Sequence, residues 1–177
     1  MENRNVGLLI DWENIRITAS ENLKSPPDII TLKKIARRYG KIAVARAYAN
    51  WTDINHEGDM ERFSLQEIEP VFVQTKRFKN IDQDKDVIKG SADIKLACDC
   101  IELIFKNPSI DTYVLASGDG GFEHIISKLK TYAKQTIPIG VMGATSSRLG
   151  VVSDELIIYD QWLAGIRMGH KDIRVSE

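Results

Sequence analysis

The chain has 177 residues, of which 43% are hydrophobic and 28% charged. This composition is typical of one globular domain and excludes a disordered, collagenous or coiled-coil chain. The net charge is −1, from 24 Lys and Arg residues against 25 Asp and Glu residues. A nucleic-acid partner would therefore need a local basic surface, because the protein as a whole is not basic.

Short apolar runs alternate with helical patterns along the whole sequence. This alternation predicts an α/β fold in which helices cover a mostly parallel central sheet. In chain order, we predict a strand at 6–10, a helix at 29–39, a strand at 41–48, a helix around 58–68, a strand at 70–74, a mobile loop at 75–89, a helix from Ser91, a strand at 112–116, a helix at 122–132, a strand at 137–141 and an edge strand at 156–159.

The cysteines and the apolar runs indicate a cytoplasmic protein. Cys98 and Cys100 lie two residues apart on a predicted helix and point in different directions, so they cannot form a disulfide with each other. Apolar runs are far shorter than the ~20 residues that cross a bilayer. An acid interrupts the first apolar run, which argues against a signal peptide, and we expect no membrane association.

Two acids follow predicted strands at their carboxyl ends. Asp11 comes directly after the first strand, and Asp119 follows the strand at 112–116 through Ser117 and Gly118. Parallel strands deliver their carboxyl ends to one edge of a sheet, where α/β proteins bind ligands. If the two strands are neighbours, their chains run about 5 Å apart. The two carboxylates are then close enough to share a cation.

A third acid lies on the helix that begins at Ser91. A helical wheel places Asp93 in the middle of the apolar face and Asp99 on the polar side. The amino end of such a crossover helix lies at the same sheet edge, and a cation would offset the cost of a buried carboxylate. Three oxygen donors without His or Cys of ligand spacing suit Mg²⁺ or Mn²⁺ and hydrolysis of a phosphodiester. The alternative is that the acids cap helices or bond to loop backbone.

Four segments resemble, in order and spacing, the motifs of NYN domains of the LabA-like group in the PIN-like nuclease superfamily. They are residues 6–14 (VGLLIDWEN), 89–99 (KGSADIKLACD), 114–122 (VLASGDGGF) and 145–159 (TSSRLGVVSDELIIY). The resemblance implies a single NYN domain over residues 1–177, with a core at about 5–160 and strand order 3-2-1-4-5. It also implies metal-dependent cleavage of RNA.

The resemblance assigns roles to five residues. Asp11, Asp93 and Asp119 match the acids that bind metal and take part in catalysis. Asn14 matches a catalytic polar residue that orients water or substrate, and Ser117 matches a residue that supports Asp119 and the substrate.

One departure from the family pattern concerns Gly121, which stands where these domains usually carry a second acid after Asp119. With one oxygen ligand fewer, we expect weak binding of divalent cations and slow cleavage, with Mn²⁺ preferred. Glu123, four residues after Asp119, is a candidate to replace the missing acid in part.

Several basic and aromatic residues are candidates for contacts with RNA. Trp12, Tyr48 and Trp51 lie at predicted strand ends and are candidates to stack on bases, with core packing as the alternative. The predicted loop supplies candidate phosphate contacts, with a plain solvated loop as the alternative. These contacts are Lys76, Arg77, Lys79, Lys85 and Lys89, with Phe78 between them.

Three functions fit these observations. The first is a metal-dependent ribonuclease that acts on single-stranded or loop RNA. The second is a catalytically weak or inactive RNA-binding module of the same fold, which Gly121 favours. The third, a small-molecule phosphatase, leaves the long basic segment without a purpose. The sequence leaves a homodimer open.

Overall fold

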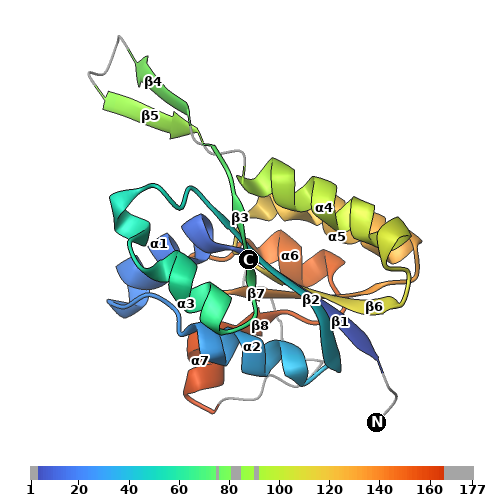
Figure 1. The fold of residues 1–177 in the computed structure, drawn as a ribbon. Helices are drawn as coiled ribbons and strands as arrows, with labels where there is room; N and C mark the ends of the chain where they lie inside the picture. The colour runs from blue at the N-terminus through green and yellow to red at the C-terminus, as the bar shows by residue number, and fades with distance from the viewer. Residues whose placement is uncertain (1–3, 75, 81–84, 90–91, 166–177) are drawn as a thin grey trace.

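A six-stranded parallel sheet forms the centre of the protein, with the strand order β3-β2-β1-β6-β7-β8. A computed structural model describes residues 4–74, 76–80, 85–89 and 92–165, with backbone alone at 76–80 and 85–89. The strands are β1 (Asn5–Asp11), β2 (Lys41–Ala49), β3 (Glu69–Phe72), β6 (Ile110–Ala116), β7 (Gln135–Gly140) and β8 (Ile157–Ile158) (Figure 1). The predicted α/β class is confirmed. Counted within this sheet alone, the order is 3-2-1-4-5-6, which extends the predicted 3-2-1-4-5 by the edge strand.

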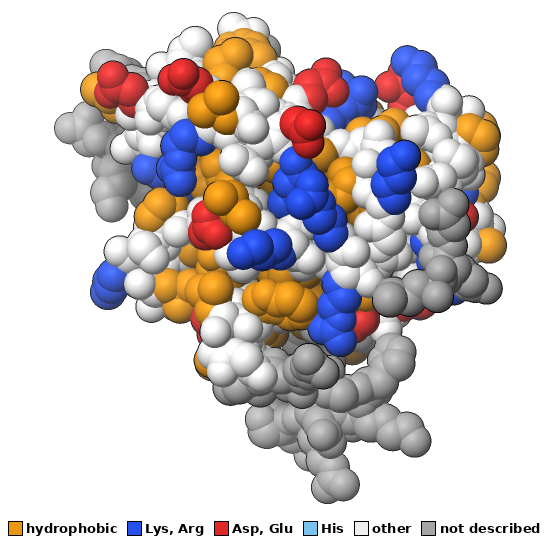
Figure 2. Space-filling view, turned by 60° about the horizontal axis from the view of Figure 1, so that its bottom comes forward, with side chains coloured by type: hydrophobic (Ala, Val, Ile, Leu, Met, Phe, Trp, Pro, Cys, Tyr) orange, Lys and Arg blue, Asp and Glu red, His pale blue; other side chains and the backbone are white. Residues whose placement is uncertain are grey.

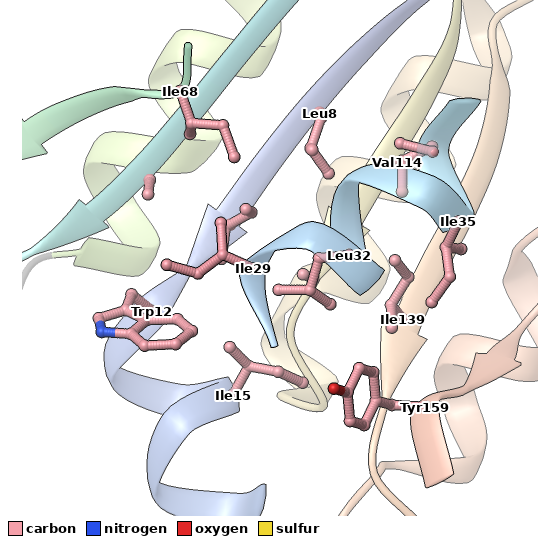
Figure 3. Packing of buried hydrophobic residues seen from close by; sticks show 14 of the residues in the cluster. Leu8, Trp12, Ile15, Ile29, Leu32, Ile35, Ile68, Val114, Ile139 and Tyr159 are labelled. Atoms are coloured by element: carbon pink, nitrogen blue, oxygen red, sulfur yellow. The ribbon is translucent and has the colours of Figure 1, made fainter. Parts of the chain in front are cut away.

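Helices cover both faces of the sheet (Figure 1). Four of them share one apolar cluster with the sheet, which Figure 3 shows from nearby: α1 (Trp12–Leu23), α2 (Ile29–Arg37), α3 (Asp59–Leu65) and α7 (Tyr159–Leu163). A second apolar cluster lies on the other side of the sheet, and the other three helices contribute to it: α4 (Ala92–Lys106), α5 (Glu123–Thr131) and α6 (Ser147–Val152). The central strands are therefore buried on both sides, which is why they appear in the sequence as continuous apolar runs.

The ends of α2 follow from local chemistry. Asp28 caps the helix by accepting hydrogen bonds from the backbone N–H groups of Ile30 and Thr31. After the helix, Gly40 has a φ of 149°, and a Cβ at this position would lie 2.1 Å from the carbonyl oxygen of Arg4. Only glycine fits there, and this close approach brings β2 alongside β1.

The prediction of a mobile loop at 75–89 is wrong. This stretch contains an antiparallel hairpin of β4 (Lys76–Asn80) and β5 (Lys85–Lys89). Figure 1 shows the hairpin rising beyond the end of β3 and leading back to the start of α4. A hairpin is held by backbone hydrogen bonds between adjacent segments, so the absence of an apolar period does not exclude it. We call β4 and β5 the hairpin arm.

Three helices, α1, α6 and α7, were not predicted from the sequence. Helices α6 and α7 are only one or two turns long, so their sequences show little periodicity. In α1 the buried residues Trp12, Ile15 and Ala19 are separated by polar residues, which weakens the apolar pattern. None of the helices in the described ranges combines the length and apolar character needed to cross a membrane.

Candidate functional site

Asp11 ends β1 at the carboxyl edge of the sheet and is buried, with 5% of its surface exposed. Its Oδ1 accepts a hydrogen bond of 3.2 Å from the backbone N–H of Asn14, so it caps α1. Its Oδ2 accepts one of 3.4 Å from the Ser117 hydroxyl. Because β1 and β6 pair in register from Leu9 and Leu115 to Ile10 and Ala116, Ser117 follows directly opposite Asp11.

Two further hydrogen bonds fix this region, one within the turn after β6 and one between that turn and the start of α1. The hydroxyl of Ser117 accepts from the backbone N–H of Asp119 at 3.2 Å. The side-chain oxygen of Asn14 accepts from the backbone N–H of Gly118 at 3.0 Å. The structure thus brings Asp11, Asn14, Ser117 and the backbone of Asp119 together, because β1 and β6 are neighbouring parallel strands.

The pKa of Asp11 is raised from 3.8 to about 7, mainly because burial penalises its charged form. The negative charges of Glu13 and Asp93 raise this pKa further, and the hydrogen bonds from Asn14 and Ser117 lower it. The charged groups that act most strongly on Asp11 are therefore acids. An arrangement of this kind gains stability from a bound cation.

Glu13 is a further acid at this edge, and it was not among the predicted site residues. Its Oε1 accepts a hydrogen bond of 2.9 Å from the backbone N–H of Asn50, just after β2. Two positions after Asp11, at the start of α1, it belongs to the acidic surroundings of the site. If a helix had been predicted directly after the first strand, Glu13 in its first turn would have been placed at the same edge as Asp11.

The wheel prediction for the two acids of α4 is wrong. Asp93 lies exposed in the first turn of the helix. Asp99 is buried, with 3% exposed, and its Oδ2 accepts hydrogen bonds from Tyr48 at 2.9 Å and from Arg46 at 3.2 Å. Its Oδ1 pairs with Lys95. Asp99 thus stabilises the packing of α4 on β2. Asp93 lies at the carboxyl edge of the sheet, near Asp11, but it is not buried.

The reason for this error is the width of the apolar arc of α4. The side that packs on the sheet is centred about 60° away from both acids. The rest of the arc is only half-buried at Ala97 and Ile101, and Ile94 beside it is exposed. These three residues line a groove between α4 and α5, and Ala97 and Ile101 also pack against the edge of the core.

Asp119 is exposed and caps the 3₁₀ turn Gly120–Phe122, accepting a hydrogen bond of 2.8 Å from the backbone N–H of Gly121. Glu123 follows in α5, but its carboxylate lies 3.3 Å from the guanidinium of Arg148. Glu123 is thus engaged in an ion pair, and its role beside Asp119 stays a prediction.

Within the described residues, no three His, Cys, Asp or Glu side chains are grouped closely enough to form a ready-made metal site. Asp11, Asp93 and Asp119 therefore share an edge without forming a closed cage. This donor set suits Mg²⁺ better than a metal ion that is fully enclosed by protein ligands. Mg²⁺ commonly uses one or two carboxylates and keeps water or substrate phosphate as its other ligands.

The predicted RNA contacts have mixed outcomes. Trp12, Tyr48 and Trp51 are buried at 0, 0 and 9% exposure, so they belong to the core and cannot stack on bases. The backbone of Lys76, Arg77, Lys79, Lys85 and Lys89 lies in the hairpin arm, but their side chains lie outside the described part of the structure.

Comparison with known proteins adds two findings. The family model of the NYN domain matches residues 5–160. Among solved structures, the chain resembles the crystal structure of VPA0982, a protein of unknown function from Vibrio parahaemolyticus RIMD 2210633. The TM-score is 0.75 and the identity 22%, over 89% of this chain and 94% of that one. At this identity, the likeness supports the fold alone. No curated protein sequence matches the chain significantly.

Proposed function

The chain belongs to the NYN domain family and has its PIN-like fold, and from this premise we propose that it is a metal-dependent endoribonuclease acting on single-stranded RNA. The observation that carries the proposal is the buried Asp11, whose pKa is raised to about 7 among acidic neighbours at the carboxyl edge. The order of the motifs around Asp11, Asp93 and Asp119 supports assignment to the LabA-like group. A cytoplasmic location belongs to the same proposal, and the free thiols of Cys98 and Cys100 support it.

In this proposal, Asp11, Asp93 and Asp119 hold Mg²⁺ or Mn²⁺. The bound ion supplies two kinds of chemistry, a lowered pKa for a water ligand and stabilisation of the charge that builds on the phosphate. The protein contributes the position and ionisation of its carboxylates. Ser117 fixes Asp11 and the backbone of Asp119 relative to each other through its single hydroxyl.

Asn14 positions the attacking water. Its side-chain oxygen is held by the N–H of Gly118, which orients the amide so that its NH₂ group can donate to a water or a phosphate oxygen. Because the N–H of Asn14 also donates to Asp11, this residue is tied to the ends of both β1 and β6. We therefore expect Asn14→Ala to slow cleavage more than it weakens RNA binding.

The hairpin arm supplies the contacts with RNA phosphates. Lys and Arg side chains on the face drawn in Figure 2 lie in separate groups, with apolar and acidic side chains between them. The hairpin sequence holds five basic residues within 14 positions, Lys76, Arg77, Lys79, Lys85 and Lys89, against the three acids Asp82, Asp84 and Asp86. It rises next to the start of α4, where Asp93 lies (Figure 1).

The test is cleavage of end-labelled single-stranded RNA by the purified chain in EDTA, Mg²⁺ or Mn²⁺. We expect cleavage only with a divalent cation, and loss of at least about a hundredfold in rate for Asp11→Asn and for Asp119→Asn. Asp111→Asn is the matched control, since Asp111 lies at the opposite, amino end of β6. Cleavage that survives in Asp11→Asn would refute the assignment.

The second candidate function is an RNA-binding module without turnover, and Gly121 is the observation that favours it. The backbone at Gly121 is compatible with other residues, but a Cβ there would lie 3.3 Å from Oδ1 of Asp119, which is a tight contact. We expect Gly121→Asp to tighten Mn²⁺ binding and to speed cleavage. RNA binding without cleavage in either protein would establish the binding module instead.

A further inference from the structure

A groove of about 530 Å³ runs between α4 and α5 and begins at the candidate site. Asp93, Asp119 and Gly121 line one end of it. The groove is thus continuous with the edge at which the phosphodiester is proposed to bind. Its volume lies within the range of sites for small molecules, and a single nucleotide falls within that range.

The walls of the groove are apolar. They are formed by Ile94, Ala97 and Ile101 of α4 and by Phe122 and Ile125 at the start of α5. Phe122 and Ile125 are buried, whereas Ile94 is 63% exposed next to the charged end of the groove. Such exposure of large apolar side chains beside a polar site is typical of ligand-binding surfaces.

We propose that this groove binds the nucleobase of the nucleotide next to the phosphodiester at Asp119. The inference rests on the proposed function and adds to it a subsite for an unstacked base. The base lies between the apolar walls, against the exposed side chain of Ile94. Apolar side chains commonly contribute to the pockets that hold unstacked bases.

The charged groups around the groove favour a nucleotide over an apolar peptide or a second copy of the chain. An apolar partner that covered the groove would also remove water from Asp93 and Asp119, which is costly for charged carboxylates. A nucleotide instead places its phosphate and a cation at that end. Lys128 and His124 line the groove from α5 and can donate to polar atoms of the base or to the next phosphate.

The first test measures binding without cleavage. AMP, UMP, adenosine and ribose 5-phosphate are titrated into the full chain in Mg²⁺, and shifts of the isoleucine methyl signals are followed by NMR. We expect AMP, UMP and adenosine to shift the signals of Ile94, Ile101 and Ile125. Ribose 5-phosphate, which has no base, should leave these signals almost unchanged. Equal shifts with ribose 5-phosphate would overturn the proposal.

The second test fills the groove. Ala97→Trp places a large ring between the walls, and Cys98→Trp makes the same change at the next, exposed position outside the groove. We expect the affinity for AMP to fall at least about tenfold in Ala97→Trp, within the range for loss of one stacked base, and to stay within about twofold in Cys98→Trp. Ile94→Asp, at an exposed position, gives the same loss without a risk to folding.

Cleavage assays separate failure of the subsite from failure of the proposed function. If RNA is cleaved with Mn²⁺ but Ala97→Trp and Ile94→Asp bind AMP and cleave like the wild type, the subsite is wrong and the nuclease stands. If no RNA is cleaved under any condition while adenosine still shifts the groove signals, the nuclease is wrong and the base site stands. A change from dimer to monomer in Ala97→Trp, without any effect of AMP, would identify the groove as a self-association surface and overturn the proposal.

Discussion

The raised pKa of Asp11 makes the free energy of unfolding depend on pH when no cation is bound. This pKa is 3.8 in a solvated chain and about 7 in the folded protein. Between these values the unfolded chain gives up a proton that the folded chain keeps, so folding stability falls as the pH rises from about 4 to 7 and stays low above 7. The full difference corresponds to an upper limit of about 4 kcal/mol.

We therefore expect Asp11→Asn to raise the melting temperature in EDTA at pH 8 and to change it little at pH 4. Asparagine still caps α1, and a gain of about 1–2 kcal/mol corresponds to about 3–6 °C. Thermal unfolding at the two pH values measures the effect. Asp154→Asn is a control of opposite sign, because hydrogen bonds from Thr136 and the charge of Lys130 hold the pKa of Asp154 below its usual value. An equal change for Asp11→Asn at both pH values would contradict the prediction.

Asp99 has a structural role, unlike the acids at the sheet edge. Asp99→Ala removes the acceptor of the buried Tyr48 hydroxyl and one partner of Arg46. We expect a loss of about 3 kcal/mol, or about 6–12 °C in melting temperature, since the buried Tyr48 hydroxyl loses its acceptor and Arg46 keeps only Glu69. The cleavage rate of the folded variant at low temperature should be unchanged. Lys95→Met, which removes the exposed partner of Asp99, should cost less than about 1 kcal/mol.

At the level of single elements, the hairpin arm can be tested apart from the core. Changing Lys76, Arg77 and Lys79 to Gln should reduce the slope of log affinity for single-stranded RNA against log salt by about two, since each phosphate contact contributes about 0.7. The melting temperature should stay within about 2 °C, because β4 and β5 form a sheet of their own. Fluorescence anisotropy over a range of salt concentrations measures the slope.

The matched control makes the same change of charge elsewhere. Lys34, Arg37 and Arg38 are exposed on α2, on the other side of the main sheet from α4 and α5. Their replacement by Gln alters the net charge equally and should leave the slope unchanged. A similar fall in both variants would mean that overall charge, and not the hairpin arm, attracts the RNA.

The same elements show what the sequence could and could not predict. Strands such as β1 were predictable because burial on both faces leaves an apolar run with no polar interruption. Parallel topology placed Asp11 and the end of β6 at one edge of the sheet, and the strand order implied by the family resemblance made β1 and β6 neighbours. The burial of Asp99 could not be predicted, because it depends on which part of a wide apolar arc faces β2. A helical wheel carries no information about that rotation.

At the scale of the whole molecule, the candidate site exists only when the sheet is assembled. Asp11 and Ser117 are 106 residues apart in the sequence and meet because β1 and β6 are neighbours. A cation that binds at their carboxyl edge therefore binds the folded state and not the unfolded chain. Any such binding must stabilise the protein by an amount that depends on cation concentration.

We expect Mn²⁺ at about ten times its dissociation constant to stabilise the wild type by about 1.4 kcal/mol, or about 3–6 °C in melting temperature. Asp93→Asn and Asp119→Asn should lose most of this rise, because each removes a carboxylate from the edge. Asp93→Asn should also leave the protein in EDTA as stable as before or more so, since its charge acts against that of Asp11. Asp111→Asn, at the amino end of the same strand as Asp119, should keep the full rise. If Asp93→Asn and Asp119→Asn respond to Mn²⁺ as the wild type does, the cation binds elsewhere on the molecule, and the carboxyl edge is not the metal site.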